Sequence, residues 1–200
     1  YRYRYQDGKT DSIPYLKYVF MYTGSGSLDL WQSFRWDTIE REWVNLDKYD
    51  YEFDDSGRRI SSMHLEWDQD KGAWNGVDRE DVAYDENGNR GSIIKFGWDP
   101  ELDSWTELMK QEIIFDEEGR RTSISGYVWD KEAKVWMGTM RVEIEYGLEW
   151  RKSLEVFYQW DPEIMDWAYL SRNIKTYNEW GNMDSMEENT LRGDVHVSTY

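Results

Sequence analysis

The side chains of this chain that could perform chemistry are mainly carboxylates, because the sequence holds 41 Asp and Glu residues, two His and no Cys. Two carboxylates facing each other in a cleft would supply the catalytic pair of a glycoside hydrolase. Most of these residues, however, recur at a fixed spacing, as Asp37, Asp68 and Asp99 do, and Asp at a loop entry caps its own turn. Catalytic residues are singular, so we expect no catalytic residue and no enzymatic activity.

Metal ligands are sparse in this sequence. His64 and His196 are too few and too far apart for a His-rich metal site, and we expect a surface role for each. The absence of Cys excludes disulfides and thiolate sites. Calcium at the acidic turns is the alternative, because residues 85–89 gather hard oxygen ligands. They lack the spacing of a calcium loop, so we expect no metal site and no cofactor.

Aromatic rings are the best candidates for ligand binding, since the chain contains 13 Trp and 15 Tyr. Flat rings can stack on sugar faces or line a peptide groove. Most of the Trp recur in register and are needed for burial in a chain that is poor in aliphatic residues. Three Trp do not recur, and we predict them as ligand-binding residues: Trp31, Trp150 and Trp180.

The recurrence has a period of 31 residues. The dipeptide Trp-Asp begins at Trp36, Trp67, Trp98, Trp129 and Trp160. A second Trp follows each dipeptide at Trp43, Trp74, Trp105, Trp136 and Trp167. Self-similarity at a fixed period is the signature of a repeat architecture, and this period is too short for a WD40 propeller blade.

Strands must position these residues, because β-branched and aromatic residues alternate with charged ones between the markers. Asp85 is expected to open a tight turn in which Gly88 takes the left-handed conformation of a hairpin loop. We therefore predict an all-β antiparallel meander of about 12–14 strands, coiled into a twisted or rolled sheet. Whether the sheet is open or closed is left undecided.

Counting positions along these strands places the two Trp of each motif on one face of the sheet, as a cross-strand pair. The same count places a basic row on the opposite face, followed two residues later by an acidic row that neutralises it. The basic row consists of Lys17, Lys48, Arg79, Lys110, Arg141 and Arg172.

The whole chain, residues 1–200, is predicted to be a single repeat domain. Residues 22–185 form the tandem repeats, residues 1–21 an N-terminal cap and residues 186–200 a C-terminal cap, since an array must close its exposed edges. The sequence opens at Tyr1 without a signal peptide, so we expect a mature or trimmed part of a longer precursor.

The net charge of −17 argues against nucleic-acid and anionic-membrane partners, because it repels phosphate groups. We find no apolar stretch of the roughly 18 residues that a membrane span needs, so we expect no membrane insertion. The oligomeric state is left undecided.

Three turns, at residues 53–58, 84–89 and 115–120, resemble the YD or RHS-type repeat, whose core is Y-D-x-x-G-R. With the interleaved Trp motif, the chain looks like hairpin-repeat proteins that anaerobic gut bacteria export to their surface or envelope. The resemblance implies that the repeats are scaffolds or binding surfaces and that no repeat residue is catalytic. The longer period and the constant Trp pair depart from that family.

We therefore expect a non-catalytic, secreted or cell-surface repeat scaffold that binds a protein or polysaccharide partner. A carbohydrate-binding module that uses exposed aromatic residues is the alternative. A glycan-active enzyme is the third possibility.

Overall fold

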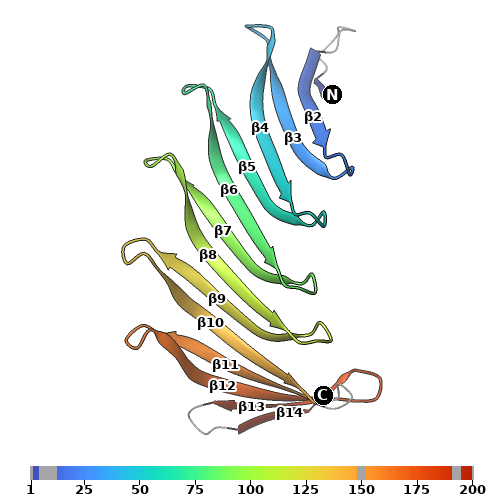
Figure 1. Cartoon of the computed structure of the whole chain (residues 1–200), viewed down its shortest axis with the longest axis vertical. Coiled ribbons are helices and arrows are strands. Elements are labelled where there is room, and N and C mark those ends of the chain that lie inside the picture. The colour runs from blue at the N-terminus through green and yellow to red at the C-terminus, as the bar shows by residue number, and fades with distance from the viewer. Residues whose placement is uncertain (1, 5–12, 148–151, 191–194, 200) are drawn as a thin grey trace. The chain divides into compact units, whose positions relative to one another are not determined.

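The computed structural model describes residues 2–4, 13–147, 152–190 and 195–199, with side chains described for residues 15–147 and 152–190. These residues form strands and turns (Figure 1). None of them belongs to a helix, so this part of the chain contains no helical segment that could cross a membrane. Trp150 lies outside the described residues, as do the side chain of His196 and those of the two ends.

The described residues form fourteen strands. The first seven are β1 (Arg2–Arg4), β2 (Ile13–Tyr22), β3 (Leu28–Asp37), β4 (Glu42–Phe53), β5 (Arg59–Asp68), β6 (Ala73–Tyr84) and β7 (Arg90–Asp99). The others are β8 (Ser104–Phe115), β9 (Arg121–Asp130), β10 (Val135–Tyr146), β11 (Lys152–Asp161), β12 (Asp166–Tyr177), β13 (Met183–Thr190) and β14 (Val195–Thr199).

The strands are ordered in the sheet as they are in the chain, which confirms the predicted antiparallel meander. The chain divides into two compact units. Unit 1 comprises Tyr1–Val82 and Lys95–Glu107, and unit 2 comprises Ala83–Ile94 and Leu108–Tyr200.

The tight turns form as their sequence predicts. The backbone N–H of Asp85 donates to the carbonyl of Asn89 at 2.9 Å, and that of Gly88 donates to the carbonyl of Asp85 at 3.0 Å. Gly88 has a φ of 85°, which is the left-handed conformation that favours glycine. Turns of the same form begin at Thr23, Asp54, Asp116 and Asn178.

The turns at the Trp-Asp end are four residues long, as in residues 38–41 between β3 and β4. The carboxylate of Asp37 accepts hydrogen bonds from the N–H groups of Ile39 at 2.8 Å and Glu40 at 3.0 Å. Arg41 then adopts a φ of 54°, which turns the chain into β4. The Asp of this dipeptide is therefore a turn residue, as expected.

The face of each unit that carries the paired Trp of the Trp-Asp motif is called the tryptophan face, and the other is called the opposite face. Each of four long strands carries a β-bulge that changes which residues lie on which face. In β4, Asn45 pairs with Phe34 and Asp47 pairs with Ser33, so Leu46 is the extra residue. The extra residues of β6, β10 and β12 are Val77, Thr139 and Leu170.

The bulge overturns the predicted position of the basic row. Lys48 pairs directly with Leu65, which lies two positions before Trp67 on β5, so Lys48 shares the tryptophan face. The prediction was wrong because it assumed strict alternation along the whole of β4. Leu46 is an extra residue, so every side chain after it lies on the face opposite to the one predicted.

Burial is shallow in both units. The buried aliphatic side chains among the described residues are Leu65, Val82, Ile113 and Val142. In the same part of the chain, the buried polar side chains are all serines: Ser33, Ser61, Ser123, Ser125 and Ser153. The hydroxyl groups of Ser33 and Ser61 donate to the carboxylates of Asp47 and Asp81. Stability therefore depends mainly on backbone pairing and on contacts between side chains of neighbouring strands.

Candidate binding surfaces

The tryptophan face is built from cross-strand Trp pairs. In unit 1, the rings of Trp67 and Trp74 lie 5.2 Å apart with their planes at 71°, an edge-to-face arrangement that is favourable for aromatic rings. Similar pairs are Trp36 with Trp43, Trp98 with Trp105, Trp129 with Trp136, and Trp160 with Trp167. These rings contact one another, which agrees with a packing role.

The basic row packs onto the aromatic residues of the same face. In unit 2, the ammonium group of Lys110 lies 4.4 Å from the ring centre of Tyr127 and 5.4 Å from that of Trp136. It also lies 2.9 Å from a carboxylate oxygen of Glu112, which accepts a hydrogen bond from the Tyr127 hydroxyl. Burial and the nearby Glu112 raise the pKa of Tyr127. The charged side chains of the tryptophan face, such as Lys110 and Glu112, are therefore paired with one another.

A polar hollow lies at the tight-turn end of unit 2. Its lining includes Ile114, Ser123, Arg141, Glu143 and Tyr146. Arg141 donates to Glu143, which also accepts a hydrogen bond from the Tyr158 hydroxyl at 2.8 Å. The strongest polar groups of the hollow are thus engaged within the protein, which makes it a weak candidate for binding sugar hydroxyl groups.

Trp31 lies in a row of stacked rings on the opposite face of unit 1. Its ring is 4.4 Å from that of Tyr49, and the two planes are within 10° of parallel. Phe20 lies on its other side, with a centroid distance of 6.5 Å. One face of the indole is therefore covered by Tyr49. Trp31 therefore belongs to a packed row of rings, and its role in ligand binding stays a prediction.

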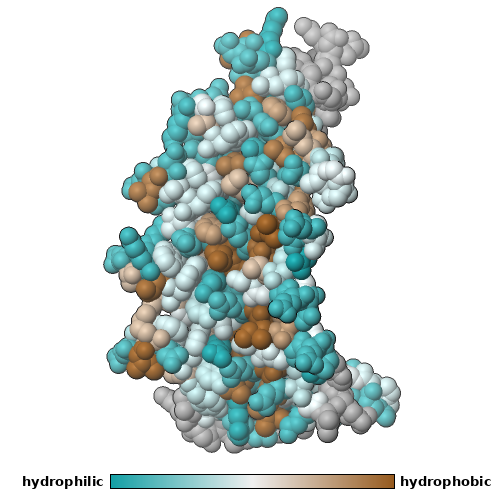
Figure 2. Space-filling view, viewed as in Figure 1, coloured by the Kyte–Doolittle hydropathy of each residue, from teal (hydrophilic) through white to brown (hydrophobic). Residues whose placement is uncertain are grey.

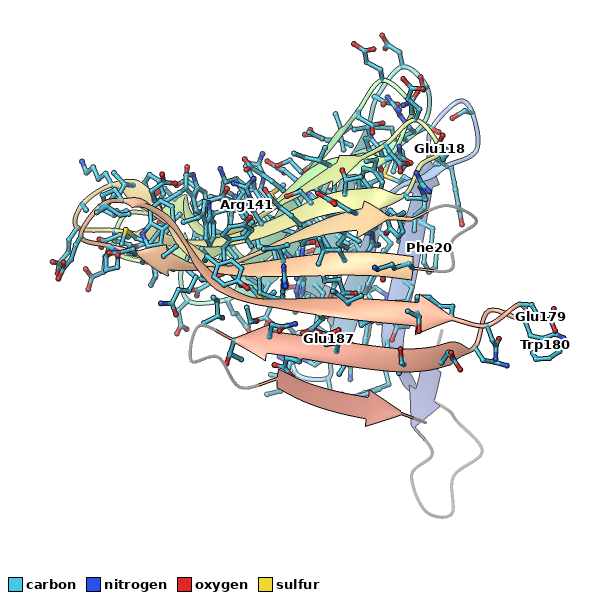
Figure 3. All side chains as sticks on the ribbon, turned by 90° about the horizontal axis from the view of Figure 1, so that it is seen from below. Phe20, Glu118, Arg141, Glu179, Trp180 and Glu187 are labelled. Atoms are coloured by element: carbon cyan, nitrogen blue, oxygen red, sulfur yellow. The ribbon has the colours of Figure 1, made fainter. Side chains whose placement is uncertain are left out.

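Trp180 has a different environment, because it lies in the turn between β12 and β13 (Figure 3). Its side chain is 77% exposed. The backbone N–H of Trp180 donates to the side chain of Asn178 at 3.0 Å, which fixes the turn and leaves the indole outside. Trp31 belongs to unit 1 and Trp180 to unit 2. The third predicted residue, Trp150, lies outside the described residues.

The acidic turns direct their carboxylates at their own backbone. The side chain of Asp85 accepts hydrogen bonds from the N–H groups of Asn87 and Asn89 and from the side-chain amide of Asn89. In the equivalent turn, backbone and side-chain hydrogen bonds from Arg58 lower the pKa of Asp54. These oxygens accept hydrogen bonds from N–H donors. This arrangement stabilises the turn and makes the oxygens poor calcium ligands.

His64 is the residue whose surroundings the sequence reasoning missed. Its imidazole stacks on Tyr49 at 4.1 Å with the planes 10° apart, which extends the row that contains Trp31. Its two ring nitrogens each lie 3.5 Å from a carboxylate oxygen, one of Asp47 and the other of Asp78. Placing the β4 bulge correctly would have revealed this, since Tyr49, His64 and Asp78 occupy one cross-strand row.

An apolar patch lies on the opposite face of unit 2. Met109 on β8 pairs with Val128 on β9, and Met140 on β10 pairs with Gly126. These three apolar side chains are 55%, 40% and 51% exposed, respectively. On the surface seen in Figure 2, hydrophobic residues form small groups separated by hydrophilic ones.

No family model matches the chain, and no curated protein matches it. Among solved structures, the chain is similar to a protein with unknown function from Bacteroides fragilis NCTC 9343, with 16% identity over 64% of this chain and 91% of that one, at a TM-score of 0.46. A DUF3836 family protein from Bacteroides vulgatus ATCC 8482 is 18% identical over 46% of this chain and 88% of its own, at a TM-score of 0.38. A porin-like protein from Bacteroides uniformis ATCC 8492 is 9% identical over 91% of this chain and 86% of its own, at a TM-score of 0.31. None of the three is described as a YD or RHS protein, so that resemblance stays a prediction.

Proposed function

We propose that the chain is a non-catalytic binding protein that recognises a protein partner through the opposite face of unit 2. The observation that carries this proposal is the apolar patch of Met109, Val128 and Met140, three neighbouring apolar residues that are each about half exposed. Exposed apolar patches mark interaction sites, and flexible Met side chains adapt to the shape of a partner.

A row of packed apolar side chains lies beside the patch on the same face. Ile113 on β8 pairs with Ile124 on β9, which pairs with Val142 on β10. Ile113 and Val142 are buried, whereas Met109 and Met140 are exposed on the same face. A buried apolar row next to exposed Met side chains, which are intrinsically flexible, suits the apolar core of a protein-binding surface.

A protein partner fits the geometry better than a glycan does. Stacking on a sugar needs a free ring face, and Tyr49 covers a face of Trp31. The polar hollow of unit 2 has its Arg141 and Glu143 bound to each other. Of the two predicted ligand-binding Trp residues that the structure describes, Trp180 is the exposed one, so the carbohydrate-binding alternative is tested first at Trp180.

The absence of catalysis and the location of the protein are part of the same proposal. Backbone hydrogen bonds from Glu40 and Ile39 lower the pKa of Asp37, and a carboxylate that stays ionised is a poor general acid. On the tryptophan face, carboxylates such as Glu112 are ion-paired. The proposed location is secreted or at the cell envelope, which is supported by the resemblance of the tight turns to exported YD-type repeats.

A random peptide library displayed on phage, together with a glycan array, tests this function. We expect the chain to select peptides, and the Met109→Lys/Met140→Lys double variant to bind them at least about 10-fold more weakly, a loss of about 1.4 kcal/mol. Ile114→Lys is the matched control, because Ile114 is a 60% exposed apolar residue on the tryptophan face of the same unit. Glycan binding that is lost in Trp180→Ala, with no peptides selected, would instead support the carbohydrate-binding alternative.

A further inference from the structure

Three carboxylates surround His64 on the opposite face of unit 1. Asp47 on β4 pairs directly with Glu66 on β5, and His64 lies two positions before Glu66. Potential ligand atoms of Asp47, His64 and Glu66 all lie within 4.8 Å of one another. Asp78 on β6 lies directly opposite His64. One imidazole and two carboxylates thus converge on a single point of the sheet surface.

The imidazole is held in place but is not hydrogen-bonded at Nε2. Only 14% of the His64 side chain is exposed, and its ring stacks on Tyr49. Nε2 is 3.5 Å from Oδ1 of Asp47, which is longer than the roughly 2.7–3.2 Å of a normal hydrogen bond. This nitrogen is buried without a hydrogen-bond partner. A buried polar atom without a hydrogen-bond partner lowers the stability of the folded chain unless a further group binds to it.

The groups behind the cluster orient its ligands. The hydroxyl of Ser33, the most deeply buried side chain described, donates to Oδ2 of Asp47 at 2.9 Å and accepts from the Asp47 N–H at 3.1 Å. Oδ1 of Asp47 is thereby directed towards His64. At the far side of the ring, a carboxylate oxygen of Asp78 lies 3.5 Å from Nδ1. This distance too is longer than a normal hydrogen bond, but a carboxylate near the outer nitrogen of a histidine is the group that usually orients a metal-binding imidazole.

The cluster is singular, which separates it from the repeated architecture. The residues 31 positions after Asp47, His64 and Glu66 are Asp78, Lys95 and Gly97. These cannot form a second site of the same kind. The surroundings are anionic, because the carboxylates of Asp47, Glu66 and Asp78 all lie close to the imidazole.

We propose that Asp47, His64 and Glu66 bind one divalent transition-metal ion, with Zn²⁺ as the best match. An imidazole nitrogen combined with two carboxylates suits Zn²⁺ and its neighbours in the first transition series, whereas calcium prefers oxygen ligands alone. The ion joins β4 to β5, and Ser33 and Asp78 position its ligands. The alternative is an imidazolium bridge between Asp47 and Asp78, which needs no metal. This proposal is independent of the protein-binding patch in unit 2.

Calorimetric titration of the metal-free full chain with ZnCl₂ tests the site. We expect one Zn²⁺ per chain and no comparable binding of CaCl₂. Glu66→Gln and His64→Ala should abolish this binding, and Asp78→Asn should weaken it by about 10- to 100-fold. Asp50→Asn is the matched control, because Asp50 lies on the same strand but on the tryptophan face, paired with Lys48 at 2.7 Å.

Spectroscopy separates a true site from loose association with the acidic surface. Zn²⁺ should shift the ¹⁵N resonance of His64 Nε2, and Co²⁺ should give a ligand-field spectrum that is lost in Glu66→Gln. Glu66 is exposed, so this variant should keep the fold, which circular dichroism checks. Absence of Zn²⁺ binding, or binding that is unchanged in both His64→Ala and Glu66→Gln, would overturn the proposal in favour of the imidazolium bridge.

Discussion

Glycine at position 76 determines how closely two indoles approach the backbone of unit 1. A Cβ atom at this position would lie 2.5 Å from Cε3 of Trp98 and 2.7 Å from Cη2 of Trp105. Atoms of real proteins essentially never come that close, so a side chain here must displace both rings. The paired Trp of one hairpin therefore occupy the space that Gly76 of the preceding hairpin leaves free.

The variant Gly76→Ala should be less stable by about 1–3 kcal/mol, the usual cost of overpacking a filled site. Urea denaturation followed by Trp fluorescence measures the change. Gly24→Ala is the control, because a Cβ atom at Gly24 meets nothing within 4 Å. Equal stability of the two variants would show that the rings of Trp98 and Trp105 move aside without cost.

The environments of residues that recur with the repeat could be predicted from the sequence better than those of residues that do not recur. The constant spacing of the Trp motif indicates paired rings, and the structure contains those pairs. Trp31 also breaks the period, but its position in a stack with Tyr49 depends on cross-strand register. His64 was expected to be an ordinary surface residue, because nothing in the linear sequence shows that Asp47 and Asp78 lie beside it.

The β-bulge is the element that determines the two faces of the sheet. Leu46 adds one residue to β4 between two paired segments, and the strand beyond it presents Lys48 to the tryptophan face. Because side chains alternate with a period of two, a single extra residue inverts all that follow. The strands and tight turns could be predicted from alternation and from Asp and Gly, but Leu46 has no comparable signal, since any residue can be the extra one.

Deleting Leu46 should lower the urea midpoint far more than truncating its side chain does. The deletion forces β4 to bring either Trp43 or Lys48 to the wrong face, whereas Leu46→Ala keeps the register and removes only a 37% exposed side chain. We expect Leu46→Ala to change stability by less than about 1 kcal/mol, as surface substitutions do. Similar midpoints for the deletion and the substitution would show that the bulge does not fix the faces.

Net charge acts on the molecule as a whole. The chain carries 41 acidic and 24 basic residues, for a net charge of −17. Ion pairs such as Lys48 with Asp50 and Lys110 with Glu112 neutralise part of this charge locally. The surplus of carboxylates remains, and self-repulsion of this kind destabilises a folded chain.

Raising NaCl from about 0.02 M to about 0.5 M should therefore raise the melting temperature, because the screening length falls well below about 10 Å. Differential scanning calorimetry in a buffer free of divalent cations measures the effect without interference from metal binding. Exposed ion pairs contribute at most about 1 kcal/mol each, so their weakening by salt should not reverse the gain. A lower melting temperature in salt would show that local pairs outweigh the net repulsion.

The geometry of the paired indoles has an optical consequence. In each of the five Trp pairs of the described residues, the ring centroids are 5.1–5.2 Å apart and the planes meet at 64–81°. Two identical chromophores at such a separation and inclination share their electronic excitation. Every closed hairpin of this kind therefore contributes a split circular dichroism band, and the chain carries its own unlabelled reporter of how many hairpins are closed.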